Sequence, residues 1–352
     1  SFMDHSVQQG ISITGNTTSG GMDSTSGVFT MRSYGVEFEI QGNDEEQEVE
    51  NISITDNTIM DCESYGIVYR SLLPNQSNLV GHCISRNRIT GKFDTPHTPT
   101  HSGVRWPIYV VLSGVGRTFL RGLNVDSNTI NPNVPNYDEF PIKGINIEGP
   151  ESIEDHVIES VSVSGNQVNL RGFTGYDNTG IQVKFKQLAS DPYTVKDFCL
   201  DRNIIKYQRT TAETPANVGM ILVNMTCSYK GTSISGNSIE YSGSNNVVGQ
   251  YTKQFDYGIR LFHEFQIGES IQNASVISSI INPRYLVGEV GQTSWDYSAA
   301  EEDGTPNGVS REFTPVTWVN TRISNNSVHF PAGRDLKAAN QLYQDDNAAM
   351  SV

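Results

Sequence analysis

A two-part pattern of alternating apolar residues recurs along almost the whole chain and constrains the fold more than any other feature. The first part is a short apolar alternation that ends in Asn, such as ISITDN at residues 52–57. The second part is a Gly followed by alternating apolar residues, such as GINI at residues 144–147. The two parts alternate in order, with their landmarks at Asn16, Gly35, Asn57, Gly66, Asn87, Gly103, Asn128, Gly144, Asn166, Gly180, Asn203, Gly219, Asn237 and Gly258. Strict alternation of this kind indicates stacked, similar units.

Each part has a period of two residues, so each predicts a short strand with one buried face. A single short strand cannot bury that face, but strands of successive repeats stacked on one another can. A propeller would need four hairpin-linked strands per repeat, and the turn pairs that mark hairpins are scarce. No window shows sustained helical spacing of apolar residues. The sequence therefore predicts an all-β fold, a parallel β-helix in which each repeat makes one coil.

The repeated Asn and Gly residues have physical roles in such a coil. Asn tolerates the left-handed backbone conformation, and its amide can bond to the next Asn in a stack, so we expect the Asn residues to stack at one corner. Gly is expected at a second corner, where a Cβ atom would clash. The apolar residues before Asn should form one interior row, comprising Ile54, Ile84, Val125, Val163, Leu200 and Ile234.

The repeat predicts one solenoid domain over residues 1–330, interrupted by an acidic insertion with Gly and Pro at 284–316. Residues 331–352 form a tail in which 335–343 is predicted to be a short helix. No signal-peptide pattern opens the chain, and a repeat unit is already under way at Ile11. Because a solenoid end needs a cap, we expect this chain to be a piece of a longer protein.

Composition excludes several classes of function. The net charge of −15 and the pI near 4.8 argue against nucleic acid and anionic membranes as partners. No apolar run approaches the roughly 20 residues of a membrane span. The four Cys residues show no metal-binding spacing, and Cys83 and Cys199 fall three coils apart, too far for a disulfide. We expect all four to be reduced, and the sequence predicts no cofactor.

The repeat units quoted above resemble the right-handed parallel β-helix of the pectate-lyase-like superfamily, over about residues 11–330. They look most like the trunk of bacteriophage tailspikes and capsule depolymerases. This resemblance implies a homotrimer in the tail of a virion that binds a bacterial surface polysaccharide, either capsule or O-antigen. The same coil serves hydrolases, lyases, epimerases and non-catalytic fibres, so the resemblance does not fix a reaction.

Stacking of the repeat also predicts which side chains line the outside of the Gly-containing strand. If the first and third residues after Gly face inward, the second and fourth face outward and stack coil upon coil. Over the first five Gly-containing strands, the polar residues at these outward positions are Glu37, Glu39, Arg70, Arg105, Asn146, Glu148, Gln182 and Lys184. Carboxylates, amides and cations in one row suit an acidic glycan, so the five residues other than Glu are predicted to bind substrate.

Glu148 is the first candidate for a catalytic carboxylate, because it lies centrally in the row with cations on neighbouring coils. Glu37 and Glu39 are the competing pair, since two residues on one strand face lie roughly 6–7 Å apart, within the range of glycosidase carboxylates. The alternative is that Glu39 with Arg70, and Glu148 with Lys184, are ordinary cross-strand ion pairs.

The loop at residues 90–102 brings His101 near Arg105 and Tyr109, so His101 and Tyr109 are predicted to contact the substrate. A His or Tyr beside an Arg is also what a β-eliminating lyase requires. Asp and His on this loop have a spacing that metal ligands can adopt, but a Pro-broken loop fixes no geometry, and no metal site is predicted.

The leading hypothesis is therefore a tailspike-like glycoside hydrolase. A non-catalytic receptor-binding fibre and a secreted uronate lyase or epimerase are the alternatives.

Overall fold

The structure is a computed structural model, and it describes nineteen segments of the chain. These are residues 6–19, 34–41, 47–62, 65–72, 77–93, 105–112, 117–133, 142–150, 156–172, 178–186, 194–209, 217–225, 228–242, 256–263, 294–296, 310–312, 318–320, 322–329 and 347–351. All regular structure within these segments is β-strand. The helix expected at 335–343 lies outside the described residues.

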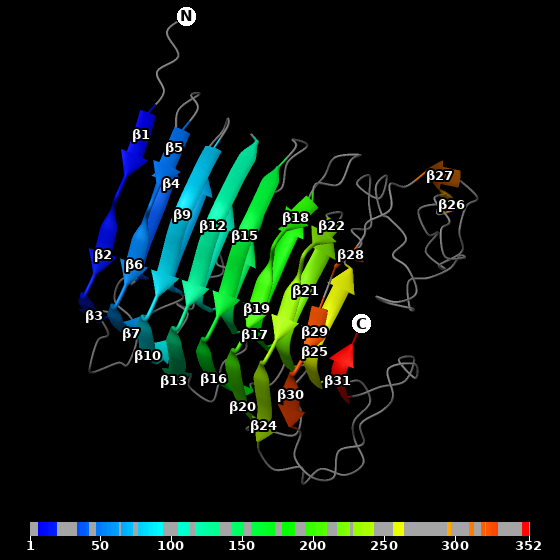
Figure 1. Ribbon diagram of the computed structural model, residues 1–352. Helices are drawn as coiled ribbons and strands as arrows, with labels where there is room; N and C mark the ends of the chain where they lie inside the picture. The colour runs from blue at the N-terminus through cyan, green and yellow to red at the C-terminus, as the bar shows by residue number, and fades with distance from the viewer. Residues whose placement is uncertain are drawn as a thin grey trace, which may run out of the picture.

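Three parallel sheets form the faces of a solenoid and run side by side along its axis (Figure 1). We call the first and largest sheet A. Its main path comprises β1 (Ser6–Gln9), β5 (Gln47–Glu50), β9 (Ser77–Ser85), β12 (Thr118–Asp126), β15 (Val157–Ser164), β18 (Thr194–Lys196), β22 (Ser228–Lys230) and β28 (Trp318–Val319). Its remaining strands are β2 (Ser12–Thr14), β6 (Ser53–Thr55), β19 (Cys199–Asp201), β23 (Ser233–Ser235) and β29 (Arg322–Ser324).

Sheets B and C each have eight strands. Sheet B comprises β3 (Thr17–Ser19), β7 (Thr58–Cys62), β10 (Arg88–Phe93), β13 (Thr129–Asn133), β16 (Gln167–Gly172), β20 (Ile204–Arg209), β24 (Ser238–Ser242) and β30 (Ser327–His329). Sheet C comprises β4 (Tyr34–Gln41), β8 (Tyr65–Leu72), β11 (Trp106–Leu112), β14 (Lys143–Glu148), β17 (Asn178–Lys186), β21 (Asn217–Met225), β25 (Asp256–His263) and β31 (Asn347–Ser351).

The chain visits sheets A, B and C in turn, and each circuit is one coil, as β15, β16 and β17 show (Figure 1). Every pairing within the three sheets is parallel, which confirms the predicted parallel β-solenoid. The two-stranded sheet of β26 (Ser294–Asp296) and β27 (Ser310–Glu312) is antiparallel, and both strands fall within residues 284–316.

The predicted interior row is confirmed. Successive register pairs join Ile54, Ile84, Val125, Val163, Leu200 and Ile234. All six side chains are buried in one hydrophobic core that fills the solenoid from coil to coil. Each coil therefore buries its apolar face against the coils above and below, as the repeat pattern requires.

The predicted Asn stack is also confirmed, and it is a continuous ladder. It comprises Asn16, Asn57, Asn87, Asn128, Asn166, Asn203, Asn237 and Asn326. At each step the amide nitrogen of one Asn donates to Oδ1 of the next, at 2.8 to 3.0 Å. The same oxygen accepts the backbone N–H of the preceding Asn, so each ladder oxygen receives two hydrogen bonds.

The expected backbone conformation of these Asn residues was wrong. The left-handed residue is the one before the ladder Asn, as at Asp56 and Arg86, with φ of 59° and 54°. Gly15, Gly165 and Gly236 occupy the same position with positive φ. The ladder needs the Asn amide to point into the corner, so the preceding residue takes the left-handed turn.

The repeated Gly residues are required for steric reasons, as expected. A Cβ on Gly66 would lie 2.5 Å from the backbone oxygen of Pro107, and one on Gly144 would lie 2.6 Å from that of Gly180. Neither Gly has a positive φ, so close approach of the next coil is what requires Gly here.

Gly103 does not belong to this series, which corrects the predicted register. In the structure Ile108 pairs with Ile67 on one side and Ile145 on the other, so Pro107 stands where the other coils have Gly. The segment offers two alternations, and the structure uses the one that buries Ile108, Val110 and Leu112 in the core.

Candidate functional site: the outer face of sheet C

The outer face of sheet C carries two rows of side chains that follow the strand register. One row runs through Glu37, Val68, Tyr109, Asn146 and Gln182. The next runs through Glu39, Arg70, Val111, Glu148 and Lys184. The inward rows between them belong to the core, so the predicted alternation of inward and outward positions holds.

Glu148 is held by two neutral hydrogen-bond donors. The hydroxyl of Tyr109 donates to Oε2 at 2.9 Å, and Nδ2 of Asn146 donates to Oε1 at 2.9 Å. Burial, together with the adjacent Glu148 carboxylate, raises the pKa of Tyr109 well above its usual value. The phenol therefore stays protonated and keeps donating, and both carboxylate oxygens of Glu148 are fixed in orientation.

Three aromatic rings stack beside this carboxylate. The rings of Trp106 and Tyr109 lie 4.8 Å apart at 12°, and Tyr65 lies 5.0 Å from Trp106 and 6.0 Å from Tyr109. All three side chains are half-buried. Half-buried aromatic rings present apolar surface beside polar groups, which is the combination that sugar rings contact in proteins.

Glu37 and Glu39 share a single guanidinium. Nη1 of Arg70 lies 3.2 Å from Oε1 of Glu37 and 3.5 Å from Oε2 of Glu39. The same guanidinium lies 5.8 Å from the centre of the Tyr65 ring. The predicted Glu39–Arg70 ion pair is thus present, and it connects the two carboxylates to the aromatic stack.

These groups form one continuous surface, which we call the aromatic–carboxylate strip. It comprises Glu37, Glu39, Tyr65, Arg70, Trp106, Tyr109, Asn146 and Glu148. Glu39 and Glu148 lie in the same row but three strands apart, which is roughly 14 Å at the usual strand spacing. The two carboxylate sets therefore stand at opposite sides of the aromatic stack.

Arg105 is not in this row, which corrects its predicted place. It pairs with Ile142 ahead of β11, and its side chain is fully buried. Tyr109 occupies the position predicted for Arg105, because Pro107 rather than Gly103 takes the Gly position of this coil.

Asn146 and Gln182 lie in the predicted row but are buried, as is Val68, which does not belong to the core cluster. Lys184 is the register neighbour of Glu148 and is half-buried. The pleat sets the direction of a side chain, but it does not determine what covers that side chain from outside.

The remaining expectations concern the predicted loop, metal ligands and membrane spans. Residues 90–93 of the loop predicted at 90–102 belong to strand β10, and the rest of it, with His101, lies outside the described residues. Within the described segments no cluster of three or more His, Cys, Asp or Glu side chains could hold a metal ion. In the same segments there is also no helix of the length and apolarity that crossing a membrane demands.

Sequence reasoning missed Tyr65 as part of the site, although the sequence contained a signal for it. Tyr34 and Tyr65 each precede a repeated Gly, and Trp106 precedes Pro107 at the same register. A column of aromatic residues just before the corner is thus visible once the register of β11 is corrected.

Two Tyr residues on sheet B are core residues. Tyr207 and Tyr241 are buried, and their rings stack at 5.1 Å and 5°. Their rings therefore belong to the core at sheet B and not to the strip on sheet C.

Neither a scan against protein-family models nor searches of curated proteins and of solved structures found a match for this chain. The parallel β-solenoid itself is compatible with polysaccharide-processing proteins.

Proposed function

We propose that this chain is a tailspike-like protein that holds a bacterial surface polysaccharide, capsule or O-antigen, against the aromatic–carboxylate strip. In this proposal Glu148 is the group that cleaves the glycan. The observation that carries the proposal is the orientation of Glu148 by Tyr109 and Asn146 beside three stacked rings. The homotrimeric assembly and the place in a virion tail belong to the same proposal and rest on the resemblance of the repeat.

The chemistry of the strip suits a sugar polymer. Aromatic rings offer apolar surface to the C–H faces of sugar rings, and carboxylate groups accept hydrogen bonds from sugar hydroxyl groups. Arg70 supplies a guanidinium that can bind a carboxylate of an acidic sugar in place of Glu37 or Glu39. Both of those ion pairs are partly exposed, so the exchange is inexpensive.

Glu148 suits the role of nucleophile or general base. Two donors fix its oxygens, and a fixed carboxylate close to a bound sugar avoids the entropic cost of orienting the group. A glycosidase also needs a second carboxyl group, about 5 to 10 Å from the first. Glu39 is too far away for this, so the second group must come from outside the strip.

The non-catalytic alternative is favoured by one specific observation. Glu37 and Glu39 are engaged by Arg70, and they stand on the far side of the aromatic stack from Glu148. A fibre that only binds its receptor would need the strip but no pair of carboxylates at catalytic distance.

The test is incubation of the protein with a panel of capsule and O-antigen polysaccharides. New reducing ends indicate cleavage, and the absorbance of an unsaturated uronate separates a lyase from a hydrolase. Glu148→Gln should lower turnover by about 10² to 10⁴ while glycan binding survives, because the amide keeps the shape but cannot transfer a proton. Glu159→Gln, on sheet A, is the matched control and should leave turnover unchanged.

Full cleavage by Glu148→Gln would eliminate Glu148 and move the assignment to Glu37 and Glu39. Binding without cleavage by the wild-type protein would instead support the fibre. A chain that bound none of the polysaccharides would contradict both.

A further inference from the structure

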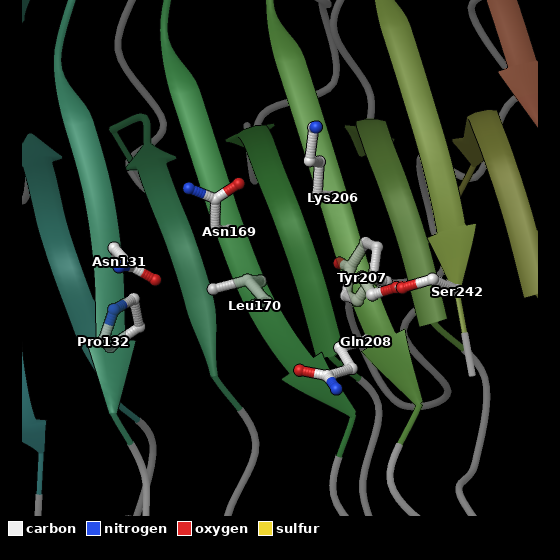
Figure 2. Close-up of a pocket in the computed structure, with 8 residues that line it drawn as sticks. All are labelled: Asn131, Pro132, Asn169, Leu170, Lys206, Tyr207, Gln208 and Ser242. Atoms are coloured by element: carbon white, nitrogen blue, oxygen red, sulfur yellow. The ribbon is translucent and has the colours of Figure 1, made fainter. Parts of the chain in front are cut away.

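Sheet B carries a second candidate site, which is a pocket, on a different face of the solenoid from the aromatic–carboxylate strip. A pocket of about 480 Å³ crosses β13, β16, β20 and β24 (Figure 2). We call it the sheet B pocket. Its polar lining comes from Asn131, Asn169, Lys206, Gln208 and Ser242.

The polar lining forms two rows that cross the coils, two residues apart along the strands. Asn169 pairs with Lys206, and Gln208 pairs with Ser242 one strand further on. Because Ile130 pairs with Val168, the residues that follow them, Asn131 and Asn169, are also neighbours. Adjacent strands lie about 4.8 Å apart, so the pocket offers polar groups at intervals comparable to the length of a sugar ring.

The floor of the pocket is apolar and rigid. Leu170 and Tyr207 line it from below, and both are almost completely buried. The Tyr207 ring stacks on Tyr241, and the Ser242 hydroxyl donates to the backbone oxygen of Tyr207 at 3.1 Å. The pocket is therefore already formed in the free chain, and a ligand would not have to organise it.

The charge of the pocket is compensated. Nζ of Lys206 lies 3.5 Å from Oε2 of Glu240, the residue that pairs with it on β24. The remaining polar groups are amides and a hydroxyl, which both donate and accept hydrogen bonds. A polyanionic glycan would meet the Glu240 carboxylate beside Lys206, whereas amides and a hydroxyl suit the hydroxyl groups of a neutral sugar.

The geometry points to a second saccharide-binding site on this chain, in which the sheet B pocket takes a short stretch of an uncharged oligosaccharide. Amides at successive coils bond to hydroxyl groups of successive sugar units, and Pro132, Leu170 and Tyr207 supply the apolar floor. Binding at this site involves no catalysis, so the inference does not depend on whether Glu148 cleaves a glycan.

Saturation-transfer NMR tests this with the wild-type chain and five probes: maltotetraose, cellotetraose, mannotetraose, chitotetraose and tetragalacturonate. At least one neutral tetrasaccharide should receive saturation, and tetragalacturonate should not compete with it. The double variant Asn169→Ala/Gln208→Ala should weaken that binding at least tenfold. Gln167→Ala is the matched control, because Gln167 is exposed on the same strand but does not line the pocket.

Three results would overturn the inference: no saturation of any neutral probe, equal binding by the double variant and the wild type, or displacement by tetragalacturonate. An unchanged melting temperature shows that the double variant is folded. Failure here is distinguishable from failure of the proposed function, because Glu148→Gln should not affect probe binding in the sheet B pocket. Conversely, the double variant should cleave saturating polysaccharide at the wild-type rate.

Discussion

Asn128→Ala removes the middle of the asparagine ladder and should be among the most damaging single substitutions in this chain. Oδ1 of Asn128 accepts from both the backbone N–H and Nδ2 of Asn87, each at 3.0 Å. Nδ2 of Asn128 donates to Asn166 Oδ1 at 3.0 Å and to the backbone oxygen of Ile84 at 2.9 Å. All four hydrogen bonds are buried.

The expected loss follows from these four bonds. Each buried hydrogen bond contributes about 1 kcal/mol net, and a donor left without a partner costs about 1–3 kcal/mol. The backbone N–H of Asn87 would be such a donor, because alanine offers no acceptor in that corner. We therefore expect Asn128→Ala to lower the free energy of unfolding by about 4 kcal/mol or more.

Asn16→Ala is the matched control at the end of the ladder. Asn16 is exposed, and its side chain donates to Asn57 Oδ1 and to the backbone oxygen of Thr14. Its backbone N–H donates to Asn57 independently of the side chain. Exposed groups can bond to water instead, so this variant should lose about 1 kcal/mol or less.

Guanidinium denaturation, followed by circular dichroism, gives the midpoint and the unfolding rate for both variants. A solenoid can unfold coil by coil, so both quantities are needed. Equal losses for Asn128→Ala and Asn16→Ala would refute the reasoning, because the ladder would then contribute no more when buried than at its exposed end.

Two further predictions concern single buried groups. His82 is buried between the Tyr69 hydroxyl and the backbone oxygen of Val49, and burial lowers its pKa to about 4. As the pH drops, the unfolded chain binds a proton at His82 before the folded chain does. The free energy of unfolding should therefore fall by up to about 3 kcal/mol as the pH drops from about 6.5 to about 4. A His82→Phe variant with the same pH dependence in denaturant titrations would contradict this. Burial and the hydrogen bond to Asp201 raise the pKa of the Cys199 thiol to about 12. Its alkylation by iodoacetamide at pH 8, followed by mass spectrometry, should be about a thousandfold slower than that of glutathione, and a comparable rate would contradict a half-buried thiol that is hydrogen-bonded to Asp201.

The inside of the solenoid could be predicted from the sequence because one pattern determines it. A side chain such as Val125 packs against the residues at the equivalent position in the coils above and below, so apolar alternation alone determines its place. The asparagine ladder followed for a similar reason: Asn at a constant distance after the buried pair lies beside its counterpart in the next coil and can bond to it. The corner dihedrals were missed because left-handed φ is also available to residues such as Asp56 and Arg86.

The site was only partly predictable, because the outside of the solenoid depends on details that the repeat does not encode. Because the corner was predicted at Gly103 instead of Pro107, Arg105 was assigned to the outward row and the aromatic column of Tyr65 and Trp106 was missed. A shift of four residues keeps the alternation of inward and outward positions, so the pattern itself gave no warning. Only packing decides between Val104 and Ile108 as the first core residue after the corner.

The two candidate sites differ in a way that reflects how each is built. The strip on sheet C depends on long side chains that reach across strands, and Glu148 is oriented by Tyr109 from the neighbouring strand. The sheet B pocket includes the short amides of Asn131 and Asn169, which stand directly on their strands above a floor that belongs to the core. A short side chain on a paired strand can be placed from register alone, whereas the contacts of a long one depend on its rotamer. Register errors therefore affect both sites, but rotamer choice affects chiefly the strip. Substitutions of its aromatic residues should alter the orientation of Glu148, while substitutions at Asn169 or Gln208 should remove local contacts only.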